Sequence, residues 1–116
     1  TELGTEDDRV ASVYFNIGNA YTNLHLYNKA LDAYTKGIKI RKTLLGADNP
    51  RLANMYFNVG VLYEYKEEYD NAITFYNQAK ELYEKQPQSF DNVKQLIAEV
   101  STCLAVCYQN KGAYQE

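Results

Sequence analysis

The clearest alternation of apolar and polar positions lies in the middle of the chain. From Leu52, apolar side chains recur at Tyr56, Val59 and Tyr63, which is the spacing of one face of an α-helix. Polar residues 66–68 follow, and then a second stripe at the same period: Tyr69, Ala72, Ile73, Tyr76, Ala79 and Tyr83. The pattern therefore predicts two helices folded into a hairpin around a short polar turn.

Gly60 lies inside the first apolar stripe. A glycine in a helix interior costs about 1 kcal/mol relative to alanine. The lack of a side chain gives room for a neighbouring backbone or ring, so we expect a close helix–helix contact at Gly60. Ala72 and Ala79 provide small residues in the second stripe.

The hairpin pattern is repeated along the chain. A shift of 42 residues aligns Gly18 with Gly60, and the other matching pairs are Leu3/Leu45, Gly4/Gly46, Arg9/Arg51, Ala11/Ala53, Tyr14/Tyr56, Asn16/Asn58, Tyr21/Tyr63, Ala30/Ala72 and Tyr34/Tyr76. A shift of 45 residues aligns 104–108 with 59–63. A period in this range indicates a solenoid of stacked units.

The residues that carry the repeat resemble the tetratricopeptide repeat family. In that family an aromatic residue, a Leu-Gly pair, a tyrosine, an alanine and a second aromatic residue follow one another. Here these positions are Tyr14, Ile17-Gly18, Tyr21, Ala30 and Tyr34, and again Tyr56, Val59-Gly60, Tyr63, Ala72 and Tyr76. Tyrosine replaces the family's first tryptophan, and the period exceeds the usual ~34 residues. With the linker 45–50, the long period resembles the kinesin-light-chain type of array.

The resemblance implies an all-α fold, a right-handed superhelical α-solenoid of two complete hairpins plus the first helix of a third. We expect a single array over residues 1–116, with repeat 1 at about 8–45, repeat 2 at about 50–86 and a partial repeat 3 at about 89–116. The fifth helix is predicted to end near Lys111–Gly112. Because the chain begins part-way through a repeat unit, we expect that it belongs to a longer array.

Composition and charge narrow the choice of partners. The chain has 116 residues, of which 46% are apolar and 23% charged, as in an ordinary soluble domain. The net charge of −3 argues against nucleic acid. No apolar run approaches the ~20 residues needed to cross a bilayer, and no leader opens the chain. We therefore expect a cytoplasmic protein that binds neither nucleic acid nor membrane.

In the family that the chain resembles, the first helix of each hairpin lines a concave groove with the side opposite its packing stripe. Carried onto this sequence, the predicted peptide-binding positions are Ser12, Phe15, Asn16, Asn19, Asn23, Asn54, Phe57, Asn58, Val61, Tyr65, Thr102 and Gln109. The same face also carries Thr22, Glu64, Glu99, Cys103, Val106 and Asn110. We refer to all of these positions together as the groove face.

Asn16 and Asn58 are the most informative of these residues because they occupy the same place in successive repeats. A carboxamide both donates and accepts hydrogen bonds, and peptide-binding members of the family use asparagines here to hold a peptide backbone. The alternative is that both are simply polar residues on a wet helix face. Phe15 and Phe57 either form apolar platforms for a ligand or pack against the next repeat.

One known subclass is not expected. Tetratricopeptide domains that clamp the C-terminal carboxylates of chaperones surround them with lysines and an arginine. Here Phe15, Glu99 and Cys103 stand where those cations are needed, and an unpaired buried carboxylate would be costly.

Catalysis has little support in the sequence, and we expect no enzyme, cofactor or metal. His25 lies in a predicted turn, without a neighbouring acid or nucleophile. Cys103 and Cys107 could form half of a metal site, but a second pair is missing, so two reduced thiols are favoured. A basic cluster on the second helix is interpreted as a solvated outer face: Lys36, Lys39, Arg41 and Lys42.

Three functions remain open from the sequence. The leading hypothesis is a protein-interaction scaffold whose concave face binds an extended peptide or helix of a partner protein. The first alternative is a structural segment that self-associates through its C-terminal end, because the fifth helix lacks its partner and Leu104, Cys107 or Tyr108 would be partly uncovered. The second is a regulatory module of an enzyme elsewhere in the parent chain.

Overall fold

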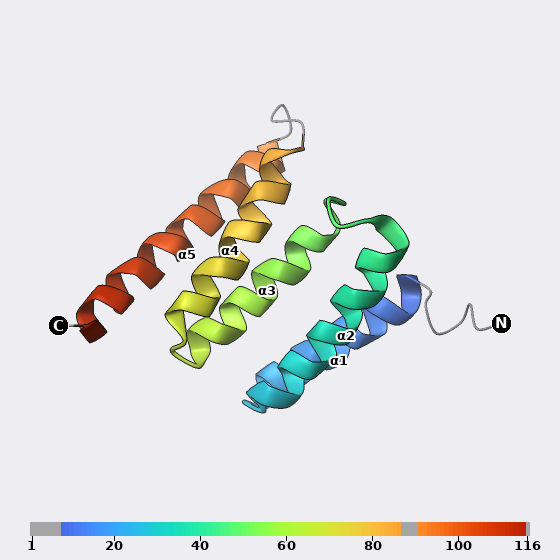
Figure 1. The fold of residues 1–116 in the computed structure, drawn as a ribbon, viewed down its shortest axis with the longest axis horizontal. Helices are drawn as coiled ribbons and strands as arrows, with labels where there is room; N and C mark the ends of the chain where they lie inside the picture. The colour runs from blue at the N-terminus through green and yellow to red at the C-terminus, as the bar shows by residue number, and fades with distance from the viewer. Residues whose placement is uncertain (1–7, 87–90, 116) are drawn as a thin grey trace.

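The computed structural model describes residues 8–86 and 91–115, and these residues form helices joined by short turns, with no strand among them. The helices are α1 (Asp8–Asn23), α2 (Tyr27–Leu45), α3 (Leu52–Tyr65), α4 (Tyr69–Glu84) and α5 (Asp91–Gln115). Figure 1 shows them following one another in chain order along the longest axis of the molecule. The predicted all-α solenoid of helical hairpins is confirmed.

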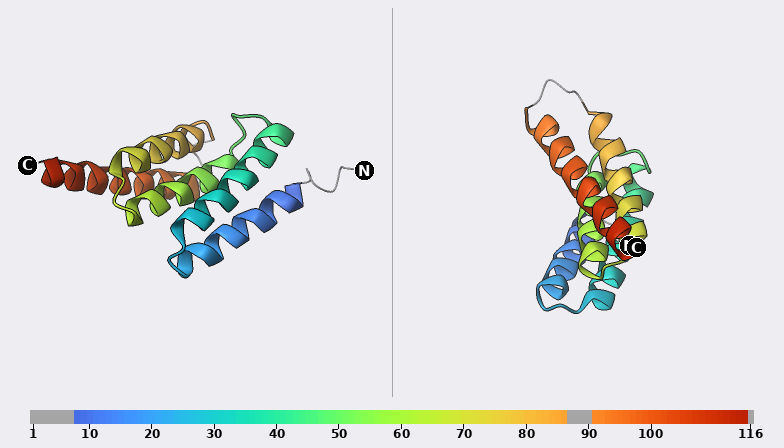
Figure 2. Two further views of the ribbon diagram at one scale, coloured as in Figure 1. Left: turned by 60° about the horizontal axis from the view of Figure 1, so that its bottom comes forward. Right: turned by 90° about the vertical axis from the view of Figure 1, so that its left-hand side faces the viewer.

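The helices are arranged in two stacked layers. Each helix packs against its neighbours in the sequence: α1 against α2, α2 against α3, α3 against α4 and α4 against α5. The shortest dimension of the molecule is 19 Å, about twice the ~10 Å diameter of one helix. Figure 2 shows the two hairpins, α1–α2 and α3–α4, stacked with an offset.

Two glycines allow the close contact inside each hairpin. A Cβ atom added to Gly60 would lie 2.7 Å from ring carbons of Tyr76, and one added to Gly18 would lie 2.5 Å from ring carbons of Tyr34. Both distances are too short for real contacts. The expected tight approach at Gly60 is therefore confirmed, and the ring of the second helix occupies the space that the glycine leaves.

The turns follow one design in both hairpins. His25 and Glu67, which are 42 residues apart, both have φ of 62°, a left-handed conformation that ends the first helix of each hairpin. Gly46 has φ of 90°, and its backbone amide bonds to the carbonyl of Lys42, closing α2. The side-chain oxygen of Asn49 accepts a bond from the amide of Arg51, so Asn49 caps the start of α3.

The main hydrophobic core lies in the α3–α4 hairpin and under α5. Leu52, Met55, Tyr76 and Cys107 are fully buried there. Of the six tyrosines at repeat-defining positions, Tyr34, Tyr56 and Tyr76 are buried, whereas Tyr14, Tyr21 and Tyr63 are half-buried.

The C-terminal helix differs from expectation in two respects. It continues through Gly112 to Gln115, whereas we predicted an end near Lys111–Gly112. Gly112 is tolerated because a glycine weakens a helix by only about 1 kcal/mol. Leu104 and Cys107, which were candidates for exposure, are buried against α4, because these two side chains face the preceding hairpin; Tyr108 is 55% exposed.

Candidate functional site

Asn16 and Asn58 are open to solvent in different degrees. Asn16 on α1 is exposed and Asn58 on α3 is half-buried. None of the hydrogen bonds among residues 8–86 and 91–115 uses either side chain, so both carboxamides are available to an incoming ligand. Neither residue is sealed inside the helix packing.

Three other polar residues predicted to line the groove are held by neighbours in the same hairpin. The Tyr34 hydroxyl donates to Asn19 Oδ1 at 2.5 Å, and the Tyr83 hydroxyl donates to Asn54 Oδ1 at 2.5 Å. Ser12 Oγ accepts a bond from the guanidinium of Arg41 at 2.7 Å. These contacts fix the orientation of Ser12, Asn19 and Asn54, and they leave the carboxamide NH2 groups of Asn19 and Asn54 unused among the described residues.

Phe15 and Phe57 are both half-buried and pack against the tyrosine of their own hairpin. The ring centroids of Phe15 and Tyr34 are 5.6 Å apart, and those of Phe57 and Tyr76 are 5.5 Å apart. Both phenylalanines also contact the hydrophobic core. Both rings are thus engaged in packing within their own hairpin, and each keeps part of its surface exposed.

The remaining predicted positions fall into two groups. Val61 is half-buried against the core, and Tyr65 is 58% exposed and stacks on Tyr27 of α2 with centroids 5.9 Å apart. Tyr65 thus lies near the turn end of the hairpins. Three exposed positions lie at the ends of the face or on α5: Asn23, Thr102 and Gln109.

Buried tyrosine hydroxyls tie the two layers together. The Tyr76 hydroxyl donates to Glu64 Oε1 at 2.7 Å, and burial together with that carboxylate raises the pKa of Tyr76. Burial and the nearby charge of Glu99 raise the pKa of Tyr83 to about 12. Both hydroxyls are therefore protonated donors at neutral pH, and Glu64 and Asn54 act as their acceptors.

The two cysteines are thiols that take part in helix packing. Burial raises the pKa of Cys107 to about 12 and also raises the pKa of Cys103, so neither is a thiolate at neutral pH. In the described part of the chain, no three His, Cys, Asp or Glu side chains are grouped so that they could hold a metal ion.

Arg41 differs from the rest of the basic cluster on α2. Lys36, Lys39 and Lys42 are exposed as expected, but the Arg41 side chain is only 12% exposed and its Nε lies 2.7 Å from Asp8 Oδ1. Arg41 was predicted to be solvated, and this prediction is wrong. The guanidinium turns into the place where α3 packs against the α1–α2 hairpin, which we name the first junction.

Sequence inspection missed the role of Arg41 and that of its counterpart, Tyr83. A shift of 42 residues places Arg41 on Tyr83 and Ser12 on Asn54. In both hairpins the residue of the second helix bonds to the residue of the first. The shared spacing was a signal that could have identified these cross-hairpin bonds, although the residue types differ.

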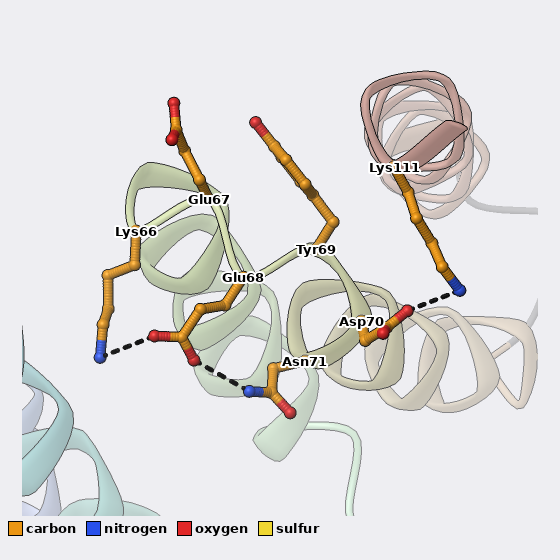
Figure 3. A pocket seen from close by; sticks show the side chains of 7 residues that line it. All are labelled: Lys66, Glu67, Glu68, Tyr69, Asp70, Asn71 and Lys111. Atoms are coloured by element: carbon orange, nitrogen blue, oxygen red, sulfur yellow. Dashed lines mark hydrogen bonds and ion pairs between the residues drawn. The ribbon is translucent and has the colours of Figure 1, made fainter. Parts of the chain in front are cut away.

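A surface pocket lies at the turn of the second hairpin, with a volume of about 620 Å³. Figure 3 shows its lining residues, most of whose charged side chains are paired: Lys66 lies 3.3 Å from Glu68, and Lys111 lies 2.7 Å from Asp70. The Asn71 amide also donates to Glu68. Because both lysines are already paired with carboxylates at this site, we do not regard this surface pocket as the binding site.

Among the described helices, none combines the length and the apolar character that a membrane span requires.

Comparisons with known proteins identify the fold. The family model described as "Tetratricopeptide repeat" matches residues 4–85. Among solved structures, the crystal structure of BtubC (BKLC) from P. vanneervenii superimposes with a TM-score of 0.84 and 23% sequence identity, covering 95% of this chain and 43% of that one. The chain thus spans less than half the length of that protein. The comparison with curated proteins gives no match.

The likeness to BtubC extends over both hairpins and α5, and it confirms the long-period arrangement at the level of the fold. Tetratricopeptide repeats generally mediate protein–protein interactions. On the match to the family model, the repeat spacing and the helical hairpins, this chain belongs to the tetratricopeptide repeat family.

Proposed function

We propose that this chain is a protein-interaction scaffold whose groove face binds an extended segment or a helix of a partner protein. The proposal rests on two asparagines at equivalent positions of the repeat whose side chains make no hydrogen bond among the described residues. Asn16 and Asn58 are 42 residues apart, and neither makes a hydrogen bond within the described chain. Their immediate neighbours Asn19 and Asn54 are held by tyrosine hydroxyls.

A pair of unengaged carboxamides suits a peptide ligand for a chemical reason. Each peptide unit offers one donor and one acceptor, and a carboxamide can satisfy both at once. A half-buried carboxamide without a partner gains most from such a ligand, because part of its hydration is already lost. The open ring surfaces of Phe15 and Phe57 beside the asparagines add apolar contact for side chains of the ligand.

The test compares the wild-type chain with the double variant Asn16→Ala/Asn58→Ala. Peptides that bind the wild type are selected from a displayed random library, and their affinities are measured by fluorescence anisotropy. The loss of two hydrogen bonds, each worth about 1 kcal/mol, should weaken binding by tenfold or more. The melting temperature should fall by no more than about 3 °C, because surface substitutions change stability little.

A matched control removes two carboxamides elsewhere. Asn77 and Gln78 are exposed on α4, and the variant Asn77→Ala/Gln78→Ala should bind the same peptides with unchanged affinity. If the double variant at 16 and 58 also binds as tightly as the wild type, the groove face is not the binding surface and the proposal fails.

A second candidate is self-association through the C-terminal end. It is favoured by Tyr108 and Val106 on α5, which are 55% and 37% exposed. Covering such apolar side chains with a second copy would stabilise the pair by the hydrophobic effect. Light scattering over a range of protein concentrations should then show mass increasing with concentration, and the variant Tyr108→Glu should remove the increase. A constant monomer mass up to millimolar concentration would exclude this candidate.

A further inference from the structure

A small cavity lies on the groove face where α5 packs against the α3–α4 hairpin, a place that we name the second junction. Figure 1 shows α5 running alongside α4. The cavity has a volume of about 150 Å³, and it is lined by Asn54, Phe57, Tyr83, Leu96, Glu99 and Val100. An apolar cavity of roughly this volume holds a group the size of benzene, so a single side chain fits.

The internal repeat gives this cavity a counterpart at the first junction. Shifts of 42 and 45 residues carry its six lining residues back onto Ser12, Phe15, Arg41, Arg51, Asn54 and Met55. Asn54 belongs to both sets, because α3 is the first helix of one junction and the last helix of the other. The two junctions therefore occupy corresponding positions in the repeat and carry different side chains.

At the first junction a guanidinium occupies this position. Arg41 Nε lies 2.7 Å from Asp8 Oδ1, one terminal nitrogen donates to Ser12 Oγ at 2.7 Å, and the other lies 3.6 Å from the sulfur of Met55. Asp8 also pairs with Arg51 at 3.5 Å. Thus the fold itself shows that the position accommodates a cationic head between a carboxylate, a short polar side chain and an apolar wall.

At the second junction the cation is missing, and the carboxylate there is a different one: Asp8 corresponds to Pro50, whereas Glu99 lies at the position of Asn54. Tyr83 replaces Arg41, and its hydroxyl is used on Asn54. Glu99 replaces Asn54, and within residues 8–86 and 91–115 no ion pair or hydrogen bond involves Glu99. Phe57, Leu96 and Val100 supply apolar walls next to this unpaired carboxylate.

We propose that the second junction is a specificity pocket for a basic side chain, with arginine preferred over lysine, of the peptide that the groove face binds. This inference rests on the proposed function. The aliphatic stem of the basic residue lies against Leu96, its head pairs with Glu99, and a planar guanidinium can also contact the open face of Phe57. The peptide supplies in trans the cation that Arg41 supplies within the chain at the first junction.

The experiment selects random peptides of about twelve residues, which span roughly 40 Å when extended, on the whole 116-residue chain. Peptides whose binding is lost in Asn16→Ala/Asn58→Ala are kept. We expect these to carry arginine or lysine at one fixed position. The variant Glu99→Gln should weaken the best of them about threefold, the scale of an exposed charge pair, whereas Glu81→Gln, the same change on the exposed side of α4 and away from the groove face, should leave affinity unchanged.

A double-mutant cycle tests whether the loss of affinity comes from direct pairing of Glu99 with the basic residue of the peptide. Replacing the peptide's basic residue by norleucine should cost about threefold with the wild type and almost nothing with Glu99→Gln. Filling the pocket from within by Tyr83→Arg should likewise remove the preference for basic peptides, and a thermal melt checks that each variant is folded.

The outcomes separate this inference from the function on which it rests. Peptides that depend on Asn16 and Asn58 but lack a basic residue, or that bind Glu99→Gln as well as the wild type, would overturn the pocket and leave the groove function intact. Recovery of no peptide that depends on these asparagines would overturn both.

Discussion

At the first junction Arg41 reaches from α2 into the contact with α3 and bonds to Asp8 and Ser12. At the second junction Tyr83 reaches from α4 into the contact with α5, bonds to Asn54, and leaves a cavity beside Glu99. The helices that meet correspond to one another in the repeat, although α5 packs more extensively against α4 than α3 does against α2. One junction completes its charge pair within the chain, and the other presents a carboxylate to a ligand. A repeat array can thus keep one packing scheme for stability while it varies a single contact for binding.

The largest difference in stability between the two junctions should appear when Arg41 and Tyr83 are replaced one at a time. Arg41→Leu should lower the free energy of unfolding by about 3 kcal/mol, because it removes one partner of a largely buried charge pair. Tyr83→Phe should lower it by only about 1 kcal/mol, because a single hydrogen bond is lost. Urea denaturation followed by circular dichroism measures both. Equal losses would mean that the junctions contribute in the same way.

Alkaline pH should act on the second junction through Tyr83. Its pKa is about 12 in the folded chain, compared with 10.0 for the unperturbed group, so the folded state retains a proton that the unfolded state releases. This contribution is fully present below pH 10 and is lost as the pH rises through 12. It amounts to at most about 2.7 kcal/mol at about 1.36 kcal/mol per pKa unit.

Denaturation at stepwise pH measures this loss. Tyr83→Phe should lose less stability between pH 10 and 12 than the wild type, since its side chain cannot ionise. An identical pH profile for wild type and Tyr83→Phe would contradict the assignment.

The smallest effect should come from replacing the helix-interior glycines, and it should be the same in both hairpins. Gly18→Ala and Gly60→Ala each place a methyl group closer than 3.0 Å to a tyrosine ring. The overpacking costs about 1–3 kcal/mol, and alanine's higher helix propensity returns about 1 kcal/mol. Each variant should therefore lose about 1 kcal/mol in a denaturation experiment. Losses that differ by more than this would show that the hairpins themselves differ, beyond their junctions.

The fold was predictable because its signals are local or strictly periodic. The stripe through Tyr56 and Tyr63, the glycine facing Tyr76 and the cap at Asn49 can each be recognised within a short stretch of sequence. The sequence offers Ser89 or Asp91 as the start of the fifth helix, and the helix begins at Asp91. The end of α5 was missed, because Gly112 occurs at the position where His25 and Glu67 make turns, yet a glycine can remain helical at modest cost.

The candidate site was only partly predictable because its key contacts join residues far apart in the sequence. Arg41 bonds to Asp8, 33 residues earlier, and nothing in the basic stretch of α2 shows that one of its four cations turns inward. Asn19 and Asn54 were assigned to the groove by position alone, and the tyrosines that hold them lie 15 and 29 residues away.

The most direct test of peptide binding at the groove face is an NMR titration of the isotope-labelled chain with a selected peptide, read at the side-chain amides of the asparagines. We expect the resonances of Asn16, Asn54 and Asn58 to shift with the peptide, while that of Asn77 on α4 stays unchanged. If the signals of Asn16 and Asn58 remain still at saturation while residues around Tyr108 shift, the peptide binds elsewhere and the central claim is contradicted.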